Sequence, residues 1–557
     1  MSNILVLVSF LLMPILEAQQ RSVSGNNGIV VSVSEYASKA GIEILKKGGN
    51  AVDAAVTTAL VLAVTYPQAG NIGGGGFMLI RLATGEAIGI DYREKAPIAA
   101  DERMFLNADG QVDTMLANYG YLVAGIPGTI RGLETAWKKY GVLPWHDLVQ
   151  PAAELATRGF VVYPPVEQTL AEESRYLRLF PESRKTFFKS DGTPYRVGET
   201  LIQADLGKTL SLIADSGASV FYEGRLGKQM VEEVRRHGGI WSNDDLSSYQ
   251  AVERTPITGT YRDLEIIGMP PPSSGGITVL ECLNILECQK LTKGDPASMH
   301  ILIEAMRRSF FDRMRFQGDA DFVEVPVSKL ISKRYARTLY QQMDKTKAFS
   351  SEEWNESIII QEENLETTHF SIVDKDGNAV SNTFTLEDNY GSHAVVEGLG
   401  FLLNSEMHDF NIRPDVPNYQ GGFGGNPNLI APAKRMLSSM APTMAVKNGK
   451  VILITGSPGG RTIINTVVQM IVNIADFDMT LRQAVDAPRL NHNWLPDEVK
   501  VERARWPEEM LRALRMRGHH IKEVQFLGDA QSIGYDEDKN QFVGEADFRR
   551  YGSAEAY

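Results

Sequence analysis

Two threonines stand at matching positions on either side of a predicted β-hairpin. Residues 367–374 and 379–385 alternate polar and apolar side chains, and the Asp376-Gly377 pair between them is a strong turn signal. Thr367 and Thr385 each lie nine residues from Asp376, so we expect them to face each other within one register step. Hydroxyls paired in this way can hydrogen-bond, but spacing alone favours an ordinary surface pair of threonines.

Other catalytic patterns in the sequence are weaker. Residues 70–76 are rich in glycine, but no Gly-Lys-Ser/Thr follows, which favours close backbone packing over phosphate binding. The sequence has no Gly-x-Ser-x-Gly elbow and no His-Glu-x-x-His, and its nine histidines are scattered. We therefore predict neither a metal nor a cofactor. An N-terminal threonine becomes the favoured nucleophile, because its own amino group can serve as the base.

Predicted strands lie toward both ends of the chain, with a mainly helical region from 128 to 366 between them. We expect strands at 28–33, 77–82, 87–92, 367–374, 379–385 and 451–455. Helices are expected at 34–47, at 51–65 and from Thr462 onward, and the almost wholly apolar second helix should be buried. This order indicates a layered α+β or α/β architecture.

The N-terminus begins with a short apolar run. Residues 4–16 are apolar except for Ser9 and Pro14, which is shorter than the roughly 20 residues of a membrane span. The run fits the hydrophobic region of a signal peptide cleaved at Ala18, although no Lys or Arg precedes it. A buried strand and a short membrane anchor are the alternatives. We expect residues 1–18 to be a signal peptide and the protein to be exported, into a bacterial periplasm or the medium.

Charge and cysteine content exclude some classes of protein. The 557 residues carry a formal net charge of −13 and no block of Lys or Arg, so a nucleic-acid partner is not expected. Cys282 and Cys288 lie six residues apart in a predicted helix. Their side chains would point about 240° from each other. We therefore expect core thiols rather than a disulfide.

The residues around Thr367 resemble the processing site of γ-glutamyltransferases. The resemblance rests first on Thr367–Asp374 with Asp376–Val380, and it extends over nearly the whole mature chain. Further motifs carry it in the family's order: Gly48–Ala55, Asp91–Pro97, Pro270–Gly276, Glu406–Phe410, Leu437–Thr443 and Gly456–Gly460. Each motif alone is weak, whereas their order along one chain is highly specific.

This resemblance implies a fold and a reaction. The fold would be the four-layer αββα sandwich of N-terminal nucleophile hydrolases, an α+β architecture. Self-cleavage between Glu366 and Thr367 would leave a large chain, 19–366, and a small chain, 367–557, associated as a heterodimer. Thr367 would then attack the substrate, with Thr385 orienting it. The backbone N–H groups of Gly459 and Gly460 would form the oxyanion hole.

The resemblance also implies a binding site for a γ-glutamyl group. Arg93, Ser438 and Ser439 match the positions that bind its α-carboxylate, and Glu406 and Asp409 match those that hold its α-ammonium. Glu387 stands where many members have Asn, which leaves its contacts and the acceptor preference open. The segment 411–435 resembles a lid, with Tyr419 and Phe423 as candidates for its shielding aromatic side chain.

The expected function is hydrolysis of glutathione and other γ-glutamyl donors, or transfer of the γ-glutamyl group to an amino acid or dipeptide acceptor. One alternative keeps the nucleophile but removes a cephalosporin side chain. A glutaryl-type acyl group has no α-ammonium, so the joint presence of Arg93, Asp409 and the two serines argues against it. The other alternative is an unprocessed binding protein, against which the intact Thr367 and Thr385 argue.

Overall fold

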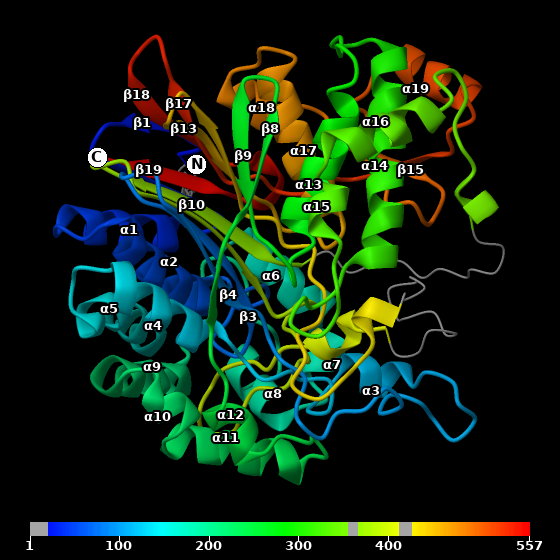
Figure 1. The fold of residues 1–557 in the computed structure, drawn as a ribbon. Helices are drawn as coiled ribbons and strands as arrows, with labels where there is room; N and C mark the ends of the chain where they lie inside the picture. The colour runs from blue at the N-terminus through cyan, green and yellow to red at the C-terminus, as the bar shows by residue number, and fades with distance from the viewer. Residues whose placement is uncertain (1–19, 355–365, 412–425) are drawn as a thin grey trace, which may run out of the picture.

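The computed structural model describes residues 20–354, 366–411 and 426–557 (Figure 1). The predicted signal peptide and the two lid aromatics, Tyr419 and Phe423, lie outside these ranges. The structure is organised around two seven-stranded sheets, and every neighbouring pair of strands in both is antiparallel.

The first sheet contains the predicted hairpin at its centre. Its strands, in spatial order, are β19 (Ser553–Ala556), β2 (Gly28–Ser32), β10 (Thr368–Asp374), β11 (Ala379–Thr385), β3 (Gly75–Arg81), β4 (Ala87–Tyr92) and β7 (Val252–Arg254). The second sheet runs β1 (Ser22–Gly25), β18 (Gln541–Glu545), β17 (Ser532–Asp536), β13 (Lys450–Thr455), β12 (Thr443–Lys447), β9 (Leu264–Gly268) and β8 (Ile257–Tyr261).

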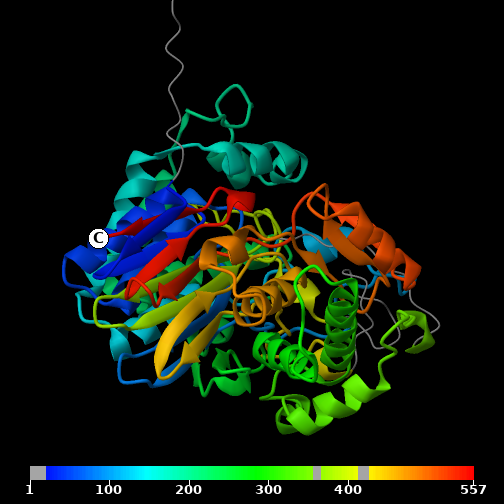
Figure 2. The same cartoon turned by 90° about the horizontal axis from the view of Figure 1, so that it is seen from above.

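The two sheets face each other, and helices cover their outer faces (Figures 1 and 2). Side chains alternate across each strand, so Val30 of β2 packs toward the helices while its neighbours Ile29 and Val31 pack between the sheets. The first sheet is covered by α1 (Glu35–Lys46), α2 (Ala51–Thr65), α4 (Thr129–Tyr140), α5 (Trp145–Arg158) and α9 (Ala204–Ser216). The second is covered by α13 (Gly275–Leu286), α14 (Pro296–Phe316), α16 (Lys333–Gln342), α17 (Thr462–Ala475) and α19 (Glu508–Met516).

Shorter elements connect these layers. They are α3 (Thr114–Asn118), α6 (Pro164–Glu172), α7 (Ser174–Leu177), α8 (Pro181–Phe187), α10 (Ser219–Tyr222), α11 (Arg225–Arg236), α12 (Asn243–Ser247), α15 (Val327–Leu330), α18 (Leu481–Asp486), β5 (Phe160–Val161), β6 (Thr200–Leu201), β14 (Leu490–Asn491), β15 (Val499–Glu502), β16 (Ile521–Val524) and the 3-10 turns η1 (Ser351–Trp354), η2 (Glu406–Asp409), η3 (Asn426–Asn428) and η4 (Phe548–Arg550).

Local sequence accounts for the central helix and the turn beside it. Every residue of α2 is buried, as its apolar sequence predicts, and Asn50 and Asp53 form a capping box at its start. The glycine-rich turn packs closely against the hairpin, because a Cβ on Gly74 would lie 2.0 Å from the carbonyl oxygen of Thr385. Backbone packing, rather than phosphate binding, is therefore its structural role.

Two details differ from the sequence predictions. The helical middle is interrupted by β7, β8 and β9, of which the first joins one sheet and the other two join the second. Cys282 is buried as predicted, whereas Cys288 is only half-buried, and both thiols are free. Among the described residues, no helix is both long and apolar enough to cross a membrane.

Candidate active site

The hairpin brings Thr367 and Thr385 together. Its register pairs Thr368 with Phe384 and His369 with Thr383, so the next residues outward are Thr367 and Thr385. Their Oγ atoms lie 3.5 Å apart, and both side chains are buried. The Oγ of Thr367 also lies 2.5 Å from the carbonyl oxygen of Glu366. The hydroxyl of Thr367 is thus held against the carbonyl of the bond that the resemblance marks for cleavage.

Thr385 is itself held in place by the backbone. Its Oγ accepts a hydrogen bond from the N–H of Glu387 at 2.8 Å and lies 3.3 Å from the Glu366 carbonyl oxygen. Glu387 adopts a left-handed backbone conformation with φ of 78°, which is strained for a residue with a Cβ. This turn after β11 therefore fixes Thr385 and directs the Glu387 side chain into the same site.

The turn after β13 contains the two glycines that the resemblance assigns to the oxyanion hole. Gly459 has φ of 125° and Gly460 has φ of 51°, conformations that favour glycine. The Gly459 carbonyl accepts from the N–H of Thr462 at 2.9 Å, which starts α17 immediately after the turn. Gly460 lines the same hollow as Thr367, whereas Gly459, the other glycine that the resemblance assigns to the oxyanion hole, lines a different hollow.

A hollow beside Thr367 gathers most of the predicted site. Its lining includes the predicted residues Thr367, Thr385, Glu387, Asp409, Ser438, Ser439 and Gly460. It also includes side chains that no motif indicated, among them Arg313, Gln317, Asn428 and Arg461. Arg93 and Glu406 do not line the hollow; both are fully buried behind its wall.

Arg93 lies at the centre of an acid-rich cluster, which comprises Glu94, Glu387, Asp388, Glu406, His408 and Asp409 around it. The guanidinium of Arg93 forms ion pairs with Glu406 and Asp409 and lies 3.4 Å from Glu94. Burial opposes the charged form of Arg93, but Glu406 and Asp409 outweigh it and raise the pKa of Arg93. Arg93 is thus paired with both acids that the resemblance assigns to the substrate ammonium.

The acids of this cluster outnumber its cations. Burial raises the pKa of Glu94 to about 8, and burial together with Glu387 raises the pKa of Asp409 to about 7. Burial also raises the pKa of Glu406 well above its usual range. Burial disfavours the charged form of His408, but Asp388 and Glu387 outweigh it and raise the pKa of His408 to about 9. A cationic ligand would complete the charge of this cluster.

The serine pair is positioned by two segments that are distant in sequence. The N–H of Ser438 donates to Pro272 O at 3.0 Å, and its carbonyl accepts from the N–H of Ser274 at 2.8 Å. The Pro270–Gly276 motif therefore works as a support for the serine loop. The Oγ of Ser439 accepts from Arg313 Nη2 at 2.9 Å, and Arg313 Nε donates to the Ser274 hydroxyl at 2.8 Å.

Arg313 is one of the site residues that sequence reasoning missed. It lies near the end of α14, in the region predicted only as helix, and it is buried beside the hollow. A run of charged residues on a helix usually marks a solvated face, so the sequence carried no signal to separate it from its neighbours.

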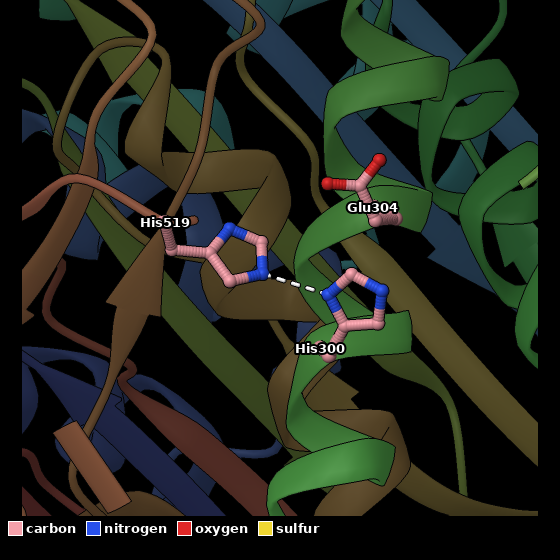
Figure 3. A group of neighbouring side chains, drawn as sticks. All are labelled: His300, Glu304 and His519. Atoms are coloured by element: carbon pink, nitrogen blue, oxygen red, sulfur yellow. Dashed lines mark hydrogen bonds between the residues drawn. The ribbon is translucent and has the colours of Figure 1, made fainter. Parts of the chain in front are cut away.

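Two groups of side chains in the described ranges combine metal-ligand types at short distance. One, Glu387, His408 and Asp409, belongs to the acid-rich cluster. The other, His300, Glu304 and His519, joins α14 to the turn before β16, and its two imidazole rings point toward each other (Figure 3).

Existing contacts explain this second group without a metal. His300 Nε2 lies 2.9 Å from Asp344 O, which can only accept, so His300 Nδ1 carries the lone pair that faces His519 Nε2 at 2.8 Å. Glu304 accepts from Arg307 Nε at 3.1 Å. The guanidinium beside the carboxylate disfavours a second cation there, and we assign no metal to the group.

Comparison with known proteins places the chain in a family. Residues 37–557 match the sequence model of the family described as gamma-glutamyltranspeptidase. The glutathione hydrolase proenzyme of Escherichia coli (strain K12) is 44% identical over 514 residues, which cover 92% of this chain and 88% of that protein. The glutathione hydrolase proenzyme of Pseudomonas sp. (strain A14) is 40% identical over 545 residues, covering 96% and 94%.

Solved structures agree with this assignment. A cephalosporin acylase from Bacillus halodurans superposes with a TM-score of 0.84 at 27% identity, covering 99% of both chains. The gamma-glutamyltranspeptidase of Helicobacter pylori is 43% identical over 56% of this chain and 90% of that chain, with a TM-score of 0.55. With the nucleophile hairpin, the glycine turn and the acid-rich cluster arranged as described, this chain belongs to the γ-glutamyltranspeptidase family.

Proposed function

We propose that the protein is a self-processing γ-glutamyltransferase and glutathione hydrolase with Thr367 as its nucleophile. The observation that carries the proposal is the Thr367 hydroxyl, held 2.5 Å from the Glu366 carbonyl oxygen and 3.5 Å from Thr385. In an ordinary pair of surface threonines the side chains would be exposed, whereas Thr367 and Thr385 are both buried. The names of the relatives at 40–44% identity supply glutathione as the substrate.

Self-cleavage would convert the precursor in two steps. The Oγ of Thr367 attacks the Glu366 carbonyl carbon, a C–O bond forms, the C–N bond breaks, and the hydroxyl proton passes to the departing amine. Water then hydrolyses the resulting ester, which leaves a carboxylate on Glu366 and restores the Thr367 hydroxyl. The products are a large chain of residues 19–366 and a small chain of residues 367–557.

The freed amino group would then serve as the catalytic base. An α-amino group has a pKa of about 8, suited to accept the proton of its own hydroxyl near neutral pH. Thr367 attacks the γ-carbonyl of the donor and expels its amine, while the N–H groups of Gly459 and Gly460 stabilise the oxyanion. Water, an amino acid or a dipeptide then takes the γ-glutamyl group from Thr367.

We expect the charged groups of the substrate to replace the ion pair between Arg93 and Asp409. The donor's α-ammonium would compete with Arg93 for Asp409 and would also face Glu387. Its α-carboxylate would take the side of Arg93 that Asp409 leaves, with the hydroxyls of Ser438 and Ser439 beside it. The similarity to a cephalosporin acylase concerns the fold. The excess of carboxylates favours an acyl group that carries an ammonium, and therefore γ-glutamyl.

The two chains are expected to remain a heterodimer. The first sheet interleaves β2, β3 and β4 from the large chain with β10 and β11 from the small chain, so separating the chains would break the sheet. The proposal of a signal peptide at residues 1–18, and of export to the periplasm or the medium, rests on the apolar run at the N-terminus.

A denaturing gel with N-terminal sequencing of the smaller band tests the proposal. We expect a band that begins Thr-Thr-His-Phe, and release of glutamate from glutathione by the same preparation. Thr367→Ala should remain one chain and have no activity. A cleaved or active Thr367→Ala protein would refute Thr367 as the nucleophile.

A further inference from the structure

The side chain of Glu366, on the acyl side of the bond to be cleaved, is anchored by an ion pair. Its Oε2 accepts from Nη1 of Arg550, and both side chains are mostly buried. Burial raises the pKa of the Glu366 carboxyl, and Arg550 opposes this increase. None of the motifs that carry the family resemblance includes Arg550.

Sheet register explains why these two residues meet. Strands β10 and β19 both pair antiparallel with β2, so they run in the same direction on either side of it. Val31 of β2 pairs with Ser371 on one side and with Ala554 on the other. Thr367 directly precedes β10 and Arg550 lies three residues before β19, so both residues lie at the same end of the sheet. Strands two places apart are separated by about 10 Å, which the Arg and Glu side chains together can span.

The backbone around Arg550 is firmly held. Arg550 ends η4, and the side chain of Asp547 before this turn accepts a hydrogen bond from the N–H of Arg549 at 3.0 Å. The carboxylate of Asp547 in turn accepts from Arg489 at 2.6 Å and from the N–H of Ala530 at 2.9 Å. Tyr551 then takes a left-handed conformation with φ of 71° that turns the chain into β19. The backbone that carries the Arg550 side chain is therefore held in place.

Glu366 and the γ-glutamyl site lie in different hollows. The hollow of Glu366 and Arg550 also contains Tyr66, Gly459 and Gly528, and it shares no residue with the hollow lined by Thr367, Ser438 and Ser439. Tyr66 lies beside the same guanidinium. Burial raises the pKa of the Tyr66 hydroxyl, and the charge of Arg550 opposes this increase. The two residues joined by the scissile bond thus line different hollows: Thr367 lines the first, and Glu366 lines the second together with Arg550.

We infer that Arg550 is a positioning residue for self-cleavage: by holding the Glu366 carboxylate, it keeps the scissile carbonyl facing the Thr367 hydroxyl. This inference rests on the proposed function. A carbonyl carbon is attacked only from above or below its plane, and rotation of Glu366 would turn that plane away. Displacement of a reacting group by about 1 Å can cost about 10²-fold in rate.

A double-mutant cycle on the cleavage rate tests the inference. Full-length chains made by cell-free synthesis are followed on a denaturing gel as wild type, Glu366→Gln, Arg550→Gln and the double variant. Each single variant should cleave at least about tenfold more slowly, and the double variant no more slowly than the singles, because all three lack the same pair. Arg550→Lys, which keeps the charge, should restore part of the rate.

Two controls separate positioning from folding. Arg482→Gln removes a distant, partly exposed ion pair with Asp486, 2.8 Å long, and should cleave like the wild type. In the uncleavable Thr367→Ala background, Arg550→Gln should keep the melting temperature of its parent. A melting temperature that falls with the cleavage rate would overturn the positioning role.

The outcomes distinguish this inference from the proposed function. A wild type that is not cleaved between Glu366 and Thr367 overturns both. A wild type that is cleaved, with Arg550→Gln cleaved at the same rate, overturns only the role of Arg550. The role of Arg550 would also be overturned if the slowing in the double variant equalled the product of the slowing in the two single variants, because the two side chains would then act independently.

Discussion

Two buried charged clusters of this protein have opposite pKa shifts: carboxyl pKa values are raised in one, and imidazole pKa values are lowered in the other. The acid-rich cluster surrounds Arg93 with carboxylates whose pKa values are raised, to about 8 for Glu94 and about 7 for Asp409. The second, the histidine cluster, comprises His300, His492 and His519 with Glu304, Arg307 and Asp497. There burial, with Arg307, lowers the pKa of His492 to about 4, and burial also lowers the pKa of His300.

The difference lies in what completes the charge. In the histidine cluster, Arg307 pairs with both Glu304 and Asp497. His300 bonds to His519 and to a backbone carbonyl, and His492 bonds to Asp497. In the acid-rich cluster, Arg93 pairs with Glu406 and Asp409, while Glu94 and Glu387 stand close by. The histidine cluster has one more carboxylate than cations, whereas the acid-rich cluster has three more, and we therefore expect a cationic ligand only in the acid-rich cluster.

The largest expected effect comes from removing the central cation of each cluster. Arg93→Met and Arg307→Met should each destabilise the protein by about 3–5 kcal/mol, because each leaves buried carboxylates unpaired. Only Arg93→Met should also abolish activity in the fraction that remains folded. Denaturant unfolding and a γ-glutamyl-p-nitroanilide assay at matched folded fractions measure both. Equal loss of activity in Arg307→Met would contradict the comparison.

Asp409→Asn should weaken substrate binding with a smaller effect on stability. An unpaired substrate ammonium costs about 2–5 kcal/mol, so kcat/KM should fall by at least about 30-fold. In the wild type, KM should decrease as the pH rises through about 7, where Asp409 becomes charged. The variant should lose this pH dependence. A variant that retains the wild-type profile would show that another group binds the ammonium.

The two clusters should change the free energy of unfolding in opposite directions between about pH 4 and 8. The folded pKa of His492, about 4, lies below its unfolded value, so its contribution is full above about pH 6.5 and is lost as the pH falls toward 4. The folded pKa values of Glu94 and Asp409, about 8 and 7, lie above their unfolded values. Their contribution is full below about pH 4 and is lost as the pH rises through 7–8.

Unfolding free energies at about pH 5, 7 and 9 measure these slopes, which reach at most about 1.4 kcal/mol per pH unit for each group. His492→Gln should remove the gain in stability that His492 gives as the pH rises from about 4 to 6.5, and should leave the slope above pH 7 unchanged. If the variant has the same slope as the wild type between about pH 4 and 6.5, His492 does not contribute to the pH dependence of stability.

The smallest effect is expected at the serine loop. Ser439→Ala removes one hydroxyl that Arg313 holds at 2.9 Å, which should cost about 1 kcal/mol and raise KM about fivefold. Arg313→Lys should give a similar increase, because a lysine cannot bond to Ser274 and Ser439 with one planar group. Unchanged KM values in both variants would show that the serine loop needs no such support.

Sequence reasoning succeeded where the determinants are local. The buried helix α2, the strands of both hairpin arms and the pairing of Thr367 with Thr385 follow from periodicity and turn chemistry within short segments. The resemblance then supplied the family and seven of the sixteen residues that line the hollow. It could not supply the pairing of Arg93 with Asp409, because that pairing depends on how η2 packs against the end of β4.

The sequence by itself determined the hairpin that brings Thr367 beside Thr385 and the layered class of the fold. Only the tertiary structure decided which distant side chains support them. Arg313 and Ser439 are 126 residues apart, and Arg550 and Glu366 are 184 residues apart. Contacts over such separations follow from the order and register of strands in a sheet and from helix packing, which no local pattern encodes.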